Sequence, residues 1–488
     1  MIYMIRIKSI KKKWQQINYR KVNNLMSAEF LHDLYNRHDP QINSIRFRNT
    51  LVIKKGEEVK TYAPKVEWES MTKWLSEKFL VHDEQTVKYT NELIKYPRNR
   101  LVAFIKEIES TDLLNISNKE LILNLIDIHY IVLGEIYKVN LVQIEKSLNF
   151  AIKSQLKKFF KEELKLNEVL SIVIFSDVET FGVKNKREMY ELVIQMQETG
   201  KFDRSKVKTF YEANKYKFTA YGADLEKYEE YLSKVEELFK IDIAVNLKYL
   251  ENLILFQKNS LSLKEEYLSE IKSDSKLMKN IDLLERLGVR RDRNKTLMGT
   301  TNLYKDKIFD EISKRTNVPI VELQNYLLSE IIELIENSTK LDLEEIEKRR
   351  KYVCFRRIEY MGFEEIDKSE FWNLDENDSN SLKGICASRG EAVGFVRIIK
   401  GSEDVSRMKK GDIMVAPGTD FDVINAMQIA GAIITEEGGI LSHASVVSRE
   451  LKIPCVIGVT DCTSILKEGQ QISVNATKGI INLKCSEL

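Results

Sequence analysis

The sequence predicts a multidomain fold of the α plus α/β class, with a large all-helical N-terminal region and a smaller, differently built C-terminal domain. Of the 20 glycines, twelve fall between Gly384 and Gly479, whereas the first 370 residues hold eight glycines and four prolines. So few helix-breaking residues indicate long helices in the N-terminal region. Its apolar residues also recur every three or four positions, the period of an amphipathic helix, for example at Leu121, Leu125, Ile128, Val132 and Ile136.

Taken in chain order, the N-terminal segment of residues 1–65 contains the one evident strand pair outside the C-terminal domain. Residues 42–52 and 59–63 are joined by Lys-Lys-Gly-Glu and predict a small β-hairpin. Helical periodicity then runs from Val66 to about Arg357, so residues 66–372 are expected to form a helical domain. Residues 373–381 are polar and turn-rich, which predicts a flexible linker before a C-terminal domain of residues 382–488.

Composition argues against several classes of function. Charged residues make up 31% of the chain but the net charge is only +2, so nucleic acid is not an expected partner. The five cysteines show no Cys-x-x-Cys spacing, which predicts reduced thiols, no metal site and a cytoplasmic location. The most apolar long stretch, residues 121–136, is interrupted by Asn124, Asp127 and His129, so a buried helix is expected there and no membrane span.

The most informative segment is residues 435–451, TEEGGILSHASVVSREL. Gly438 and Gly439 allow another molecule to approach the main chain closely, as phosphate-handling loops require. Ser442 is a natural helix N-cap and places His443 in the first turn, where unpaired N–H groups favour an anion. Imidazole is nucleophilic when neutral and also a good leaving group, so His443 is suited to carry a phosphoryl group.

This segment and its surroundings resemble the phosphohistidine swivelling domain of the enzymes that use phosphoenolpyruvate (PEP), a family that includes PEP synthase, pyruvate phosphate dikinase and rifampin phosphotransferase. The resemblance begins at LKGICASRGEAVGFVRII from Leu382 and continues through DIMVAPGTDFDVINAM from Asp412. After the histidine segment it includes IPCVIGV from Ile453 and ends with LKEGQQISVNATKGIINL from Leu466. It implies a β/β/α domain in which His443 is phosphorylated and carries the group between two separate sites.

The resemblance also places several side chains near the phosphoryl group: Thr435, Glu436, Gly438, Gly439, Ser442 and Arg449. The alternative interpretation makes His443 a capping or core histidine, and Thr435, Glu436 and Arg449 ordinary strand-end and surface residues. Cys455 is expected to be a packed thiol. The chain departs from the family at Leu441, where plant dikinases that are switched by phosphorylation have threonine, and at Asn475-Ala476, where the family usually has Asp-Gly.

Two further domains of the family are not expected in this sequence. A PEP- or pyruvate-binding barrel needs about 250 residues, whereas 45 residues follow His443 in a chain of 488. The N-terminal region lacks the alternating strands and glycine-rich loop of an ATP-grasp domain. ATP and Mg²⁺ are therefore expected on a separate ATP-grasp partner, as in a split enzyme. Weaker similarity to the helical domain of rifampin phosphotransferase is seen in residues 179–193, 210–232 and 308–335.

The helical domain is expected to hold a small-molecule phosphate acceptor. The basic cluster of Arg290, Arg291, Arg293 and Lys295, in an expected loop after Gly288, could balance charge on the transferring phosphate. An exposed charged turn is the alternative. Tyr216, Phe218 and Tyr221 could line an apolar pocket, or could be ordinary helix core. No residue can be named from the sequence as the base that deprotonates the acceptor.

These observations predict a cytoplasmic phosphotransferase component in which His443 receives phosphate from ATP on a partner and passes it to a small molecule, with dikinase-type chemistry. A second hypothesis is a non-enzymatic binding module that is regulated by phosphorylation of His443. A third is that the phosphorylated acceptor is an intermediate in a condensation. The acceptor's identity and the oligomeric state are not readable from the sequence.

Overall fold

A computed structural model of the chain describes residues 14–21, 50–55, 58–95, 104, 107, 111–135, 141–179, 181–214, 227–351, 353–358, 362–365, 381–399, 402–419, 423–436, 443–459 and 462–483. The chain divides into two compact units. The larger comprises Met1–Leu166 and Ile172–Phe371, and the smaller comprises Trp372–Leu488 with Asn167–Ser171. The expected linker, residues 373–381, lies outside the described residues except for Ser381, which begins a strand.

The larger unit contains a five-stranded antiparallel sheet in the order β1-β3-β2-β4-β5. Its strands are β1 (Trp14–Lys21), β2 (Thr50–Lys55), β3 (Glu58–Pro64), β4 (Val353–Ile358) and β5 (Gly362–Glu365). The hairpin expected near residues 42–63 is present as β2 and β3, with Lys55 opposite Glu58 at the turn. The expectation that helices continue to Arg357 is wrong, because the chain after Lys351 returns as β4 to pair with β2. Because β4 pairs with a strand about 300 residues earlier in the chain, the sequence around residues 353–358 gives no local signal of this pairing.

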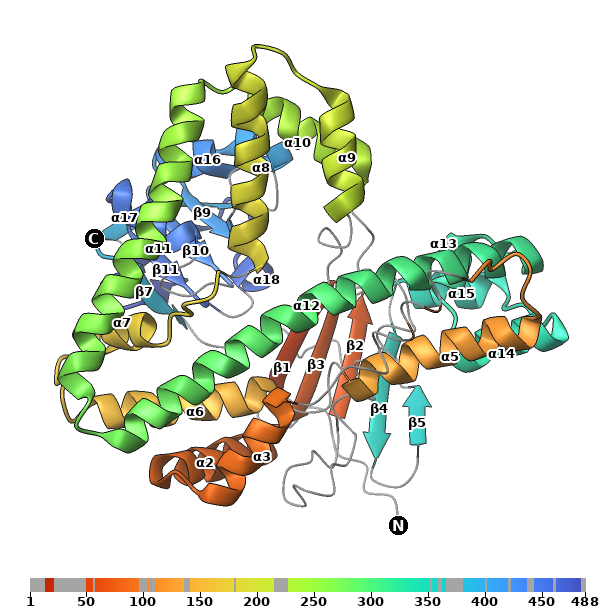
Figure 1. Ribbon diagram of the computed structural model, residues 1–488, viewed down its shortest axis with the longest axis horizontal. Helices are drawn as coiled ribbons and strands as arrows, with labels where there is room; N and C mark the ends of the chain where they lie inside the picture. Colours follow the sequence, from red (N-terminus) through yellow and green to blue (C-terminus); the bar gives the residue numbers. More distant parts are fainter. Residues whose placement is uncertain are drawn as a thin grey trace. The chain divides into compact units, whose positions relative to one another are not determined.

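Helices make up most of the rest of the larger unit in the part that the structure describes (Figure 1). They are α2 (Lys65–Val81), α3 (Glu84–Lys95), α5 (Asn118–Glu135), α6 (Leu141–Leu156), α7 (Glu163–Val173), α8 (Phe181–Glu198), α9 (Arg204–Asn214), α10 (Tyr228–Lys240), α11 (Ile243–Ile271), α12 (Ser275–Thr316), α13 (Ile320–Leu323), α14 (Leu328–Asn337) and α15 (Leu343–Lys351).

The 42-residue helix α12 is the element against which most of these helices pack. Asp274 caps its first turn by accepting from the Leu277 N–H at 3.0 Å, and Asn317 ends it in the left-handed conformation. Its C-terminal half contributes Ile308 and Ile312 to a core shared with α5 and α14. Leu121, Leu125 and Ile128 of α5 are buried in that core, as the apolar periodicity predicts; they lie with Ile331 and Leu334 of α14.

The smaller unit contains an eight-stranded mixed sheet in the order β6-β13-β12-β8-β9-β10-β11-β7. The four central neighbours β8 to β11 run parallel, and the flanking pairs are antiparallel. The strands are β6 (Ser381–Lys383), β7 (Ile385–Ser388), β8 (Glu391–Ile398), β9 (Ile413–Ala416), β10 (Ala432–Thr435), β11 (Cys455–Ile457), β12 (Gln471–Asn475) and β13 (Ile480–Asn482). The helices between them are η4 (Ser402–Arg407), α16 (Ile424–Ile429), α17 (His443–Glu450) and α18 (Cys462–Ile465).

Glycines allow the backbone segments that lead into these parallel strands to lie in contact. A Cβ atom on Gly431 or on Gly394 would lie 2.5 Å from the carbonyl oxygen of Gly411, closer than side-chain carbons approach an oxygen. Gly411 itself has a φ of 89°, in the region that favours glycine. The Gly431 N–H donates to the Asp412 carbonyl at 2.8 Å, which fixes the approach. Part of the glycine enrichment of the C-terminal domain therefore serves close packing of the main chain.

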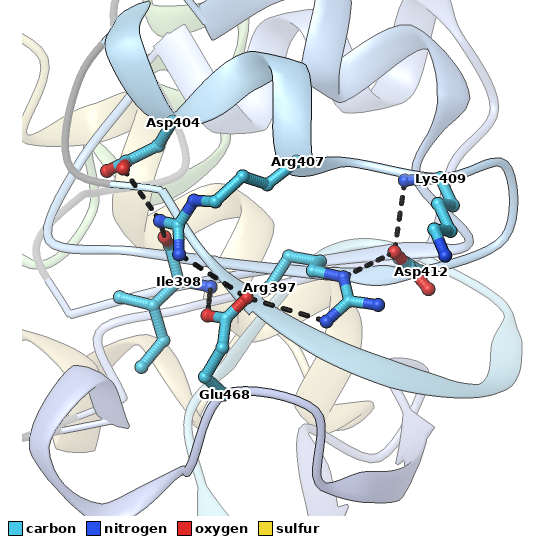
Figure 2. A network of polar contacts seen from close by, with 7 residues as sticks. All are labelled: Arg397, Ile398, Asp404, Arg407, Lys409, Asp412 and Glu468. Atoms are coloured by element: carbon cyan, nitrogen blue, oxygen red, sulfur yellow. Dashed lines mark hydrogen bonds and ion pairs between the residues drawn. The ribbon is translucent and has the colours of Figure 1, made fainter.

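Figure 2 shows an ion-pair network that joins β8, η4 and the turn before β12. Arg397 donates through Nε to Asp412 at 2.8 Å, and Asp412 is only 5% exposed. Glu468 accepts from the backbone N–H of Ile398 at 2.8 Å and also lies 3.5 Å from Arg407. The Asp412 pair is the most buried of these contacts, so it contributes most to stability.

We expect Gly431→Ala to destabilise the C-terminal unit by about 1 to 3 kcal/mol, because the added methyl group meets main chain that cannot rotate away. Peptide-resolved hydrogen exchange of the full chain would show faster exchange in β9 and β10. Gly418→Ala is the matched control, because no atom lies within 4 Å of a Cβ built there. Equal exchange in both variants would contradict the close-packing explanation.

A second substitution tests the network of Figure 2. Arg397→Met should destabilise the C-terminal unit by about 1 to 3 kcal/mol, because it leaves the buried Asp412 carboxylate without its charged partner. Arg407→Met should cost less than about 1 kcal/mol, since its ion pairs are exposed. Urea-dependent proteolysis of the full chain, followed by mass spectrometry of fragments from residues 381–483, measures both. Equal losses would show that burial does not set the strength of these pairs.

Candidate functional site

The candidate site lies at the carboxyl ends of the parallel strands. There the Val459 N–H donates to the Thr435 carbonyl at 2.9 Å, and the Glu436 N–H donates to the Ala416 carbonyl at 3.1 Å. The ends of β9, β10 and β11 are thus held in register. Ligands of open parallel sheets bind at this edge, where the loops after the strands meet.

Glu436 has a structural partner that the sequence did not indicate. Its Oε1 accepts from the backbone N–H of Thr463 at 2.8 Å and also from the Thr463 hydroxyl. It therefore caps the start of α18 from a strand end 27 residues earlier in the chain. This carboxylate thus helps to order the strand ends at the site. Its predicted contact with a phosphoryl group stays a prediction. Thr463 was missed because a cap supplied from a distant strand has no local motif.

Thr435 is fully buried at the last position of β10. In the part of the chain that the structure describes, its hydroxyl oxygen has no hydrogen-bond partner. A buried hydroxyl without a partner costs free energy, about 1 to 3 kcal/mol. Such a group at a strand end can accept or donate a hydrogen bond to a ligand, and the phosphoryl-binding role of Thr435 stays a prediction.

His443 is the first residue of α17, as the sequence predicted. Gly438, Gly439 and Ser442 lie outside the described residues. The side chains of Ala444, Ser445, Val447 and Ser448 are buried against the sheet. Because one face of this short helix is so tightly packed, its first turn is fixed at the carboxyl edge of the strands.

The last turn of α17 is anchored by Arg449, whose Nε donates to the Ala387 carbonyl of β7 at 3.0 Å. The helix ends at Glu450; Lys452, two residues later, has a φ of 56°, and the Ile453 N–H returns to the Ser448 carbonyl at 2.8 Å. Arg449 lies six residues after His443, which corresponds to a rise of about 9 Å along the helix. The structure thus gives Arg449 an anchoring contact, and its phosphoryl-binding role remains a prediction.

Cys455 is a packed thiol, as expected. It is fully buried in β11, and burial raises the pKa of its thiol to about 12. Its Sγ lies 4.0 Å from the Ala444 carbonyl of α17. A thiol that stays protonated at neutral pH is a poor nucleophile, so Cys455 serves the packing of α17 on the sheet.

The basic cluster does not lie in a loop. Arg290, Arg291, Arg293 and Lys295 all belong to α12, which passes through Gly288 without interruption. A single glycine weakens a helix by only about 1 kcal/mol relative to alanine, and packing on both sides overrides that cost. Arg291 forms an ion pair with Glu145 of α6, and the side chain of Lys295 lies outside the described residues.

Arg290 and Arg293 line a cavity of about 700 Å³ in the larger unit. The Arg290 Nη1 donates to the Ile94 carbonyl at 3.3 Å. The cavity wall also includes Asp177 and Val178, which follow α7, and one face of α12. Two of the four predicted basic contacts, Arg290 and Arg293, are therefore brought together at a cavity, whereas Arg291 pairs with Glu145 instead.

Tyr216, Phe218 and Tyr221 lie outside the described residues. Among the residues described, no group of His, Cys, Asp or Glu side chains is arranged to hold a metal ion. In that same part of the chain, none of the helices combines the length and apolarity of a membrane span.

Comparison with known proteins identifies the C-terminal unit. Residues 408–479 match the family described as "PEP-utilising enzyme, mobile domain". Phosphoenolpyruvate synthase of Pyrococcus furiosus is 45% identical over 100 residues, which is 20% of this chain and 12% of that protein. A protein named pyruvate kinase from Bacillus licheniformis is 41% identical over 100 residues, 20% of this chain and 17% of its own length.

A probable phosphoenolpyruvate synthase of Archaeoglobus fulgidus is 44% identical over the same length, 20% of this chain and 13% of that protein. Among solved structures, the holo-form of Thermococcus kodakaraensis aconitase X covers 21% of this chain and 98% of its own, at 21% identity and a TM-score of 0.18. The family match over residues 408–479 and the PEP synthase relatives place the C-terminal region in the mobile-domain family of the PEP-utilising enzymes. The chain spans only 12% to 13% of the length of these two PEP synthases.

Two threonine substitutions should have opposite effects on stability. Thr435→Val should stabilise the C-terminal unit by about 1 kcal/mol, because it removes a buried hydroxyl without a partner. Thr463→Val should destabilise it by about 1 kcal/mol, because it removes a hydroxyl that donates to Glu436. Urea-dependent proteolysis of the full chain, read out from fragments of the C-terminal unit, measures the stability of both variants. A loss of stability in both variants would mean that the Thr435 hydroxyl has a partner in the protein itself.

Proposed function

We propose that the chain is a phosphotransferase component in which His443 carries a phosphoryl group to a small-molecule acceptor held by the helical unit. The observation that carries the proposal is the position of His443. It opens α17 at the carboxyl edge of the parallel strands, in a domain of the PEP-utilising mobile-domain family. The N–H groups of a helix start and the partial positive charge there favour a phosphoryl group on this histidine.

The buried Thr435 hydroxyl supports the proposal, because a phosphoryl oxygen would satisfy it. Phosphorylation would therefore remove a cost that the free protein bears. Gly438, Gly439, Ser442 and Arg449 are proposed as further contacts to the group. In this scheme the C-terminal unit swivels between the phosphate donor and the acceptor.

The proposed donor is ATP bound with Mg²⁺ on a separate ATP-grasp protein, with dikinase-type chemistry that leaves AMP and phosphate. The glycine-poor, helical character of the first 370 residues supports a nucleotide site on another polypeptide. The domain arrangement proposed here is like that of rifampin phosphotransferase, with a helical acceptor domain beside the histidine domain, in the cytoplasm.

The experiment is acid-labile labelling of the full chain with β-labelled ATP, with and without an extract of the source cells. Label is expected on the wild type only with extract, and none on His443→Ala. His82→Asn is the control histidine, because His82 lies at a helix junction with a φ of 56°, a conformation that asparagine tolerates. Labelling of the chain by ATP without extract would contradict the proposal that ATP is bound by a separate partner protein.

Labelled phosphoenolpyruvate serves as a second donor arm, because relatives of the domain are named PEP synthases. Labelling of the chain by phosphoenolpyruvate but not by ATP would show that phosphoenolpyruvate is the phosphate donor. A stable phosphoprotein that never passes its label to any small molecule would instead support a binding module switched by phosphorylation. Label that resists acid, or that persists in His443→Ala, would contradict the phosphohistidine.

A further inference from the structure

The cavity beside α12 carries opposite charges on its wall. Arg286, Arg290 and Arg293 recur along one face of the helix, and Asp177, Asp282 and Glu285 line the same cavity. A small molecule in this cavity would meet guanidinium groups and carboxylates together. Such a wall suits a ligand that has both an anionic group and a hydroxyl that can donate a proton.

The arginines are not equivalent. Arg286 donates from Nη1 to the Asn91 side-chain oxygen at 2.6 Å and from Nη2 to Asp282 at 2.7 Å. Arg290 reaches the Ile94 carbonyl, so both arginines fix α3 against α12. Among the described residues, Arg293 has no hydrogen-bond or ion-pair partner and is exposed. Its guanidinium is therefore the cavity cation most available to an anionic ligand.

Behind the carboxylates lies Lys264 of α11, whose side chain is 5% exposed. Its Nζ donates to the Phe175 carbonyl at 2.7 Å, to Asp177 Oδ1 at 2.7 Å and to Glu285 Oε2 at 2.9 Å. A buried ammonium ion requires such partners, since an unpaired charge in the interior is very costly. Lys264 therefore holds both carboxylates in fixed positions at the cavity wall.

Asp282 pairs with Arg286 and is not held by a buried lysine. Of the two carboxylates that Lys264 holds, only Asp177 keeps an oxygen without a partner among the described residues. Glu285 uses both, because its Oε1 also accepts from the Asp177 N–H at 3.0 Å. Asp177 contributes Oδ1 to Lys264, its side chain is 64% exposed, and Oδ2 has no partner in the described part of the chain. A carboxylate that is held by a buried lysine and open to the cavity has the geometry of a general base.

We propose that Asp177 is the base that deprotonates the acceptor, and that the acceptor is a small hydroxy acid whose anionic group binds Arg293. This inference rests on the proposed function. The acceptor oxygen attacks phosphorus and forms the P–O bond, while the P–N bond breaks with its electron pair left on the ring nitrogen. Asp177 takes the hydroxyl proton, and the His443 ring, protonated at its other nitrogen, leaves as neutral imidazole. Charge and atoms balance without another reactant.

The first test is binding of hydroxy acids to the full chain, with D-glycerate, lactate and 4-hydroxybenzoate as probes in ligand-observed NMR. We expect Arg293→Gln to weaken binding roughly tenfold or more, because it removes a charge-assisted hydrogen bond. Asp177→Asn should bind the anion as well as the wild type or better, because a negative charge has gone. Arg204→Gln, an exposed arginine on α9, is the control. Failure of all three probes to bind, or equal binding by Arg293→Gln, would overturn the acceptor class.

The second test follows label from phosphorylated His443 to the bound probe. Asp177→Asn should keep the label on His443 but slow its transfer by about 100-fold or more, the effect of losing a general base. Asp310→Asn, an exposed aspartate elsewhere on α12, makes the same charge change outside the cavity. Transfer at the wild-type rate in Asp177→Asn would overturn Asp177 as the base. If the wild type never carries label, the proposed function is wrong. The binding test would still show whether the cavity binds a hydroxy acid.

Discussion

Close main-chain contact around the Gly411 carbonyl is the constraint on which the C-terminal unit depends. Gly394 and Gly431 approach the same oxygen from two different segments, which leaves no room for a side chain at either position. This contact fixes β8 against the segments that lead into β9 and β10. Because the strands are parallel, fixing their starts also fixes their carboxyl ends, where Thr435 and Glu436 lie. The candidate site at the carboxyl ends of these strands is thus positioned by packing near their amino ends.

The larger unit is organised differently, around one long helix. Helix α12 contributes to the apolar core at one end and to the charged cavity farther toward its start. In both places the spacing of three and four residues brings side chains to a common face. A single continuous helix therefore links packing and a polar site, and the cavity arginines take their positions from a scaffold that the core stabilises.

Buried polar groups mark both candidate sites in different ways. Lys264 is buried but fully partnered, so it orders carboxylates without a ligand. Thr435 is buried and its hydroxyl has no partner among the described residues, so a ligand that hydrogen-bonds to it would relieve that cost. In the proposed function, the first arrangement pre-organises the acceptor cavity and the second favours a phosphoryl group on His443. The two features together suit a chain that holds one substrate and carries another.

The sequence by itself determined the helical N-terminal region, the β2–β3 hairpin, the mobile-domain resemblance and the start of α17 at His443, because each depends on local periodicity, turn chemistry or a contiguous motif. Tertiary structure alone decided that β4 joins the N-terminal sheet and that Glu436 caps α18. It also decided that Arg290 and Arg293 share a cavity wall with Asp177. These relations join residues far apart in the chain, and packing energy overrode the glycine at 288 that suggested a loop. A single sequence records the residues that meet in such places but not the pairing between them.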